Sequence, residues 1–90
     1  MKYKGTFYKQ CVMKDFISLK NVKSVYYFED REFVSLTITY FNNEEPNKYR
    51  KRIEGLEVEQ KIYVIERYKE TYIKIKNALT NTEDFVEVEV

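Results

Sequence analysis

The sequence predicts an all-β protein, a small barrel of five to six strands. Residues 33–40 alternate apolar and polar side chains with a period of two, as expected of a strand with one buried face. Turn-forming residues at 42–47 follow, and then a polar strand, so 33–41 and 48–54 form a predicted hairpin. Finally, residues 56–79 are rich in Ile, Val, Tyr and Thr, which favour strands.

The rest of the chain supplies shorter elements. Residues 22–28 are rich in β-branched and aromatic side chains and are predicted to form a strand, and the charged residues 29–32 then form a turn. Residues 3–13 mix aromatic side chains with lysines in no helical period, which indicates a strand bent at Gly5 or a loose arm. Residues 16–19 are a short apolar piece that precedes the 22–28 strand.

Residues 56–79 leave two interpretations open. As a helix, the segment has an apolar stripe whose members are spaced by three or four residues: Ile65, Tyr68, Tyr72, Ile75 and Leu79. Against a helix, three lysines fall within this stripe, and only Gly55 stands where a good capping residue is expected. The three lysines are Lys61, Lys69 and Lys76. The strand interpretation pairs 61–67 with 71–77 and gives the barrel, whereas the alternative is an α+β fold, an antiparallel sheet with one helix at about 57–79.

The length of the chain, 90 residues, predicts a single domain over 1–90. Its C-terminal segment, 83–90, is acidic and contains no basic residue, and we expect a strand or an extended tail there. Cys11 is the single cysteine, which excludes an intrachain disulfide and fits a reducing cytoplasm. We expect Cys11 to be a small buried residue. No apolar run is long enough for a signal peptide or a membrane span, so no membrane association is expected.

The residue types argue against an enzyme. The chain has no histidine, so the commonest general base and the commonest nitrogen ligand for metals are both missing. One cysteine cannot build a thiolate zinc site, and two isolated glycines do not form a phosphate-binding loop. The paired carboxylates lie in polar segments where we expect them to be solvated. We therefore predict a non-enzymatic binding protein with no catalytic residue, metal or cofactor.

The strongest candidate for a binding site is the basic run Lys48, Arg50, Lys51 and Arg52. In a strand, Lys48, Arg50 and Arg52 share one face, at a spacing of about 6.5–7 Å that suits the phosphates of a single nucleic-acid strand. The chain also contains nine tyrosines and six phenylalanines, more than so small a core needs. Exposed tyrosines offer ring faces on which bases stack, and the candidates for this role are Tyr26, Tyr40, Tyr63, Tyr68 and Tyr72.

The order of these segments resembles the middle and end of an OB-fold barrel. A long alternating strand and a basic strand are followed by residues 55–64, in which Gly55, Leu56, Val58, Ile62 and Val64 match the segment that leads into the fourth strand of such barrels. The size and tyrosine content are similar to those of the single-stranded-DNA-binding proteins of filamentous phages. The resemblance covers roughly residues 22–77 and implies a five-stranded barrel whose open face binds single strands.

Two other hypotheses concern protein partners. The first is a small accessory protein from a phage or another mobile element that binds and modulates a host protein. It is suggested by the near-zero net charge, the excess of tyrosine and the acidic C-terminus. A helix over residues 56–79 would favour this hypothesis, because the chain could then not form the barrel. The second is a homodimer that pairs through the edges of its sheets. Single-stranded nucleic acid, a protein partner and a second copy are thus the expected partners.

Overall fold

The computed structural model describes residues 14–43 and 45–89, and the elements predicted within 3–13, together with Cys11, lie outside the described residues. The described elements are, in chain order, β1 (Lys14–Ser18), β2 (Val22–Glu29), β3 (Phe33–Tyr40), β4 (Asn47–Arg52), α2 (Val58–Thr80) and β5 (Phe85–Glu89). The predicted strands at 22–28 and 33–40 and the acidic C-terminal strand are confirmed within one or two residues.

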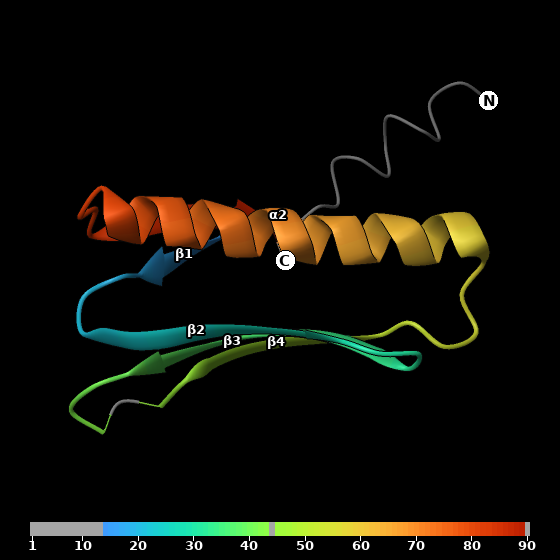
Figure 1. The fold of residues 1–90 in the computed structure, drawn as a ribbon, viewed down its shortest axis with the longest axis horizontal. Coiled ribbons are helices and arrows are strands. Elements are labelled where there is room, and N and C mark those ends of the chain that lie inside the picture. Colours follow the sequence, from blue (N-terminus) through green and yellow to red (C-terminus); the bar gives the residue numbers. More distant parts are fainter. Residues whose placement is uncertain (1–13, 44, 90) are drawn as a thin grey trace.

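Strands β2, β3 and β4 form an antiparallel sheet with β3 in the centre. The predicted hairpin is confirmed, because Leu36 lies opposite Tyr49 and Val34 lies opposite Lys51 across the β3–β4 pair. Successive side chains of β3 point to opposite faces of this sheet. Its even-numbered residues are buried beneath α2, whereas its odd-numbered residues are only half-buried on the other side. Figure 1 shows α2 running along one side of the sheet, and no described element on the other.

Strands β1 and β5 form a separate two-stranded antiparallel ribbon. β1 leads into β2 through a tight turn at Asn21, which has a positive φ of 62°. The ribbon is tied to the large sheet by side chains: the Tyr49 hydroxyl donates to Asp15 Oδ2 over 2.8 Å, and the Tyr40 hydroxyl donates to the Ser18 carbonyl over 3.0 Å. The ribbon therefore helps α2 to cover the inner face of the sheet.

The strand pair predicted at 61–67 and 71–77 is wrong, because these residues lie in one continuous helix, α2. Its apolar stripe packs inward: Ile75 is fully buried, and Tyr68 and Tyr72 pack against the core. The lysines within the stripe do not prevent this, because their long side chains reach the surface at its border. Lys69 Nζ lies 3.8 Å from the Glu29 carboxylate, for example.

Both ends of α2 are capped by residues that differ from the usual choices. Glu57 is the N-cap, and its backbone N–H donates to Gln60 Oε1 over 3.4 Å, the Gln60 half of a capping box. At the other end, Glu83 N–H donates to the Ala78 carbonyl and Thr82 N–H donates to the Leu79 carbonyl. With Thr82 at φ 55°, these two bonds form a Schellman motif. A search for a small polar N-cap and a glycine C-cap therefore misses this helix.

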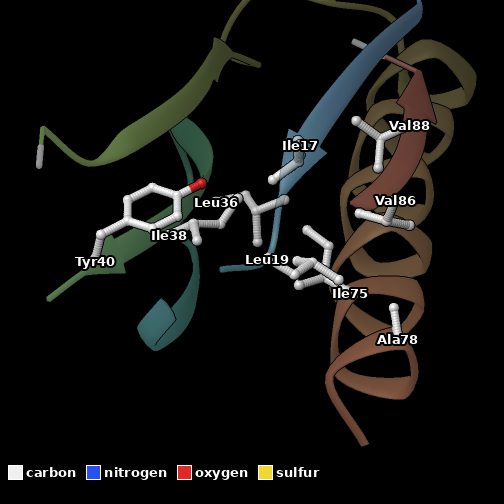
Figure 2. Packing of buried hydrophobic residues seen from close by; sticks show 9 residues of the cluster. All are labelled: Ile17, Leu19, Leu36, Ile38, Tyr40, Ile75, Ala78, Val86 and Val88. Atoms are coloured by element: carbon white, nitrogen blue, oxygen red, sulfur yellow. The ribbon is translucent and has the colours of Figure 1, made fainter. Parts of the chain in front are cut away.

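The core lies between the inner face of the sheet, α2 and the β1–β5 ribbon. Figure 2 shows Leu36 and Ile38 from the sheet directed toward Ile17 and Leu19, with Ile75 of α2 beside them. Val86 and Val88 contribute the inward side of β5. Apolar side chains from β1, β3, α2 and β5 thus meet in one buried cluster.

The all-β barrel is wrong. The five strands that the structure describes form two open sheets, and the residues predicted to supply the last strand pair of the barrel lie in α2. The chain has the alternative α+β fold, with the helix close to the expected 57–79. The physical reason is that tertiary packing of an apolar stripe outweighs the modest strand preference of Ile, Val, Tyr and Thr.

Candidate nucleic-acid interface

The candidate site is the outer face of the three-stranded sheet, which we define by the outward-facing residues of its strands. These residues are Ser24, Tyr26, Phe28, Phe33, Ser35, Thr37, Thr39, Lys48, Arg50 and Arg52. They fall into three lanes: aromatic residues on β2, small hydroxyl residues along most of β3 and cations on β4. None of these ten residues is acidic. The face therefore combines ring surfaces, hydrogen-bonding groups and positive charge.

The cationic lane consists of Lys48, Arg50 and Arg52, which lie on one side of β4 as its alternation predicts. Arg52 forms an ion pair with Glu54 over 3.0 Å at the exposed end of the strand. Neither Lys48 nor Arg50 forms an ion pair with any residue that the structure describes. Two cations are therefore available to an anionic ligand, and the third is shared with a neighbouring carboxylate.

The aromatic lane consists of Tyr26 and Phe28, which are 59% and 40% exposed. Their rings stack side by side, with centroids 6.5 Å apart and planes inclined by 19°. Both rings therefore present nearly parallel surfaces on the same side of the sheet. Such surfaces accept planar apolar groups, including nucleobases.

Phe33 links the aromatic side of the face to the cationic side. The Arg50 guanidinium carbon lies 4.8 Å from the centroid of the Phe33 ring, and that of Arg52 lies 5.5 Å away. Each guanidinium is attracted by the electrons of the ring, an interaction worth about 0.5–1 kcal/mol at exposed sites. The contact therefore places both guanidinium groups over the outer face of the sheet.

The start of β3 is fixed by Asp30. Its Oδ1 accepts hydrogen bonds from the backbone N–H groups of Phe33 and Glu32, both over 2.8 Å. These bonds favour the charged carboxylate and hold the pKa of Asp30 below its usual value. The carboxylate thereby fixes the backbone at Phe33, which carries the ring beneath the two arginines.

Between the two outer lanes, β3 contributes Ser35, Thr37 and Thr39. Thr37 lies directly between Tyr26 and Lys48, and Ser35 lies between Phe28 and Arg50. Neighbouring strands are about 4.8 Å apart, so the aromatic and cationic lanes are separated by roughly 10 Å. The small side chains make the surface between the two outer lanes shallow. Their hydroxyl groups can donate and accept hydrogen bonds.

The other predicted site residues lie elsewhere. Lys51 points to the inner side of the sheet, where it faces the first half of α2. Tyr40 is 7% exposed in the core, and its hydroxyl accepts a hydrogen bond from Asn47 Nδ2 over 2.7 Å. Tyr63, Tyr68 and Tyr72 are all on α2. Of the five predicted tyrosines, the structure thus places only Tyr26 on the outer face.

Burial explains why two of these tyrosines are structural. Tyr72 packs on Tyr27, with ring centroids 5.9 Å apart, and Tyr68 packs against the core. Burial also raises the pKa of Tyr68. The pKa of Tyr27 is raised by burial and by the hydrogen bond that its hydroxyl donates to Glu29. The rings of Tyr27, Tyr68 and Tyr72 thus belong to the layer between the sheet and the helix.

Sequence reasoning missed Phe28 and Phe33, although the pattern contains the signal for both. Phe28 is two residues from Tyr26 in β2, and Phe33 is two residues from Ser35 in β3, so each shares a face with its neighbour. The same rule places Tyr40 with Leu36 and Ile38 on the buried side. Consistent use of alternation therefore selects phenylalanines as well as tyrosines.

Comparison of the chain with protein-family models, curated proteins and solved structures found no match. Among the described residues, no group of three or more Cys, Asp or Glu side chains could hold a metal ion. The one described helix is too polar to cross a membrane. The geometry of the outer face is therefore the feature that bears on function.

Proposed function

We propose that the protein binds single-stranded nucleic acid on the outer face of its three-stranded sheet. The observation that carries the proposal is that exposed, stacked rings share one face of the sheet with two cations, and that within residues 14–43 and 45–89 no helix covers this face and no carboxylate pairs with Lys48 or Arg50. Because the protein is not a barrel, the proposal rests on the chemistry of this face alone. Open sheets with aromatic side chains bind single strands in this way in other proteins.

The two outer lanes have complementary roles. Lys48 and Arg50 attract the phosphates, which supplies affinity that is independent of sequence. Tyr26 and Phe28 accept bases on their exposed rings, and each stacked base contributes about 1–3 kcal/mol. The hydroxyl groups of Ser35 and Thr37 lie between them and are placed to contact sugars or base edges. A single strand lying along β4 with its bases turned toward β2 meets all three lanes.

This arrangement selects single strands over duplexes. In a duplex the base faces are stacked on each other and are hidden from protein rings, so only the phosphates remain accessible to the sheet. The aromatic lane then contributes nothing, and affinity depends on two or three cations. We therefore expect duplex DNA to bind much more weakly than single strands.

The test is fluorescence anisotropy of labelled single-stranded DNA, single-stranded RNA and duplex DNA at several salt concentrations. For single strands, the logarithm of the affinity should fall with the logarithm of salt with a slope of about −0.7 per phosphate contacted. Arg50→Ala should make this slope shallower by about one contact. Phe28→Ala should weaken binding by about 1–3 kcal/mol without changing the slope, because it removes stacking and not charge.

Tyr63→Ala is the matched control, because Tyr63 is as exposed as Tyr26 but lies on α2. It should leave both affinity and slope unchanged. The proposal fails if no single strand binds at low salt. It also fails if Tyr63→Ala weakens binding as much as Phe28→Ala does.

A further inference from the structure

Strand β4 lies at the edge of the three-stranded sheet that the structure describes. Among the described residues β4 pairs only with β3, so one row of its backbone groups has no strand beside it. The Ile53 N–H donates to the Glu32 carbonyl over 2.7 Å, and hydrogen-bonded positions alternate along an antiparallel pair. The backbone N–H and C=O groups of Tyr49 and Lys51 therefore point toward β3. Lys48, Arg50 and Arg52 direct theirs to the open edge.

The side chains around this edge differ between the two sides of the sheet. On the outer side, the residues with outward-directed backbone groups are the three cations of β4. On the inner side, an open hollow of about 380 Å³ lies between β4 and the first half of α2 and is lined by Lys51, Leu56, Glu59, Gln60, Tyr63 and Val64. A second hollow of about 120 Å³ adjoins it, since Lys51 and Val64 line both. We call these two hollows the edge groove.

We infer that the β4 edge binds an extended segment of a partner protein by strand addition, and that this segment alternates acidic and apolar residues. An added strand hydrogen-bonds to the backbone of Lys48, Arg50 and Arg52. Partner residues directly opposite these positions have their side chains on the outer side, next to three cations, which selects acids. The residues between them point inward, toward the edge groove.

The edge groove suits apolar side chains. Leu56 and Val64 are half-buried, and the exposed ring of Tyr63 extends the apolar wall. Burying a Val or Leu side chain there removes apolar surface from water on both molecules, at about 25 cal/mol per Å². Edge cations repel a second basic strand, so they prevent indiscriminate pairing while favouring an acidic one. Backbone, charge and shape thus specify one kind of partner.

The inference shares the cations of β4 with the proposed nucleic-acid site, but it depends on the backbone edge and the edge groove and not on the rings of the outer face. Its test is a titration of ¹⁵N-labelled protein with a short synthetic peptide that alternates glutamate and valine. We expect the largest amide shifts at Lys48, Arg50 and Arg52, and slower hydrogen exchange of these three amides. A peptide that alternates lysine and valine should not bind.

Two variants and one modified peptide separate strand addition from simple charge attraction. Arg50→Glu should weaken the glutamate–valine peptide roughly tenfold, the equivalent of about 1.4 kcal/mol, whereas Lys20→Glu, in the exposed turn before β2, should not. Methylation of alternate peptide nitrogens should abolish binding, because it removes the backbone donors. If the methylated peptide binds equally well, strand addition is excluded.

Other outcomes would overturn the inference. Amide shifts that depend on protein concentration without peptide would show that a second copy occupies the edge, through its own acidic segment 83–89. Absence of shifts at the β4 amides, with single-stranded nucleic acid still bound, would assign the cations to the outer face alone. Equal binding of the lysine–valine peptide would exclude the proposed selection for acids.

Discussion

The two faces of the three-stranded sheet are built from the same strands, but one face is buried and the other is exposed. In β3, Val34, Leu36 and Ile38 are at most 1% exposed, while Ser35 and Thr37 between them face outward. The inner side of β3 is mainly aliphatic and is covered by α2 and the β1–β5 ribbon. The outer face combines exposed rings, hydroxyl groups and cations, and no element among the described residues covers it. One face thus supports the fold, and the other is available for a ligand.

The largest expected difference concerns the buried face. Leu36→Ala removes a side chain that is 1% exposed at the centre of the core, and should lower the free energy of unfolding by about 2–5 kcal/mol. Thr37→Ala, the next residue on the outer face, should change it by no more than about 0.5 kcal/mol. Denaturant unfolding of both variants measures the difference. Equal losses would show that the outer face is packed as well.

A smaller effect is expected for the tyrosine hydroxyls. Tyr40→Phe removes a hydroxyl that donates to the Ser18 carbonyl and accepts from Asn47, and should destabilise the protein by about 1 kcal/mol. Tyr26→Phe makes the same chemical change on the outer face and should have no measurable effect on unfolding. If both variants unfold alike, the Tyr40 hydroxyl does not tie β3 to β1.

Arg50→Ala should affect stability less than either buried change. The cation–π contact with Phe33 is at an exposed site, so we expect a loss of no more than about 0.5–1 kcal/mol. The same variant should nevertheless alter the salt dependence of single-strand binding. Thermal unfolding combined with anisotropy measures both quantities. A large loss of stability with unchanged binding would show that Arg50 supports the fold and does not contact the ligand.

The smallest expected effect is a pH-dependent change in stability from Asp30, in the turn between β2 and β3. Because the folded pKa of Asp30 is lowered, its contribution to stability is present above the ordinary value of about 4 and is lost as pH falls through the folded pKa. Asp30→Ala should therefore destabilise the protein at pH 7, and the difference from the unchanged protein should shrink on acidification.

Asp30→Asn is the matched variant for this effect. It retains a neutral acceptor for the N–H groups of Glu32 and Phe33, so its stability relative to Asp30→Ala should not depend on pH in this range. Unfolding midpoints measured between pH 3 and pH 7 provide the comparison. A constant difference between the unchanged protein and Asp30→Ala would contradict the proposed role of the charge.

Local patterns predicted the strands well and the helix poorly. The alternation in 33–40 and the turn residues after it identified β3, β4 and the face shared by Lys48 and Arg50, because both signals are contained in neighbouring residues. The helix depends on distant partners: Tyr72 needs Tyr27, and Ile75 needs the core. Those contacts are not visible in a window of the sequence, and the Glu57 and Thr82 caps are atypical.

The candidate site was predicted in part for the same reason. Its cations come from one strand and could be recognised together, whereas its rings come from two other strands whose pairing the sequence does not state. Tyrosines were preferred because they are numerous, but on the outer face two of the three rings are phenylalanines. Assigning each ring to a face by alternation would have excluded Tyr40 and included Phe28.

The pairing of β1 with β5 has a consequence for the order of folding. It joins opposite ends of the described chain, with Lys14 opposite Glu89, whereas the pairings within β2, β3 and β4 are between neighbours. Closing a longer loop loses more chain entropy, and non-local pairings form more slowly. We expect pulse-labelling hydrogen exchange during refolding to protect the Leu36 amide before that of Ile17, and the reverse order would exclude this sequence of events. The ribbon that completes the core is then the last part of the protein to assemble.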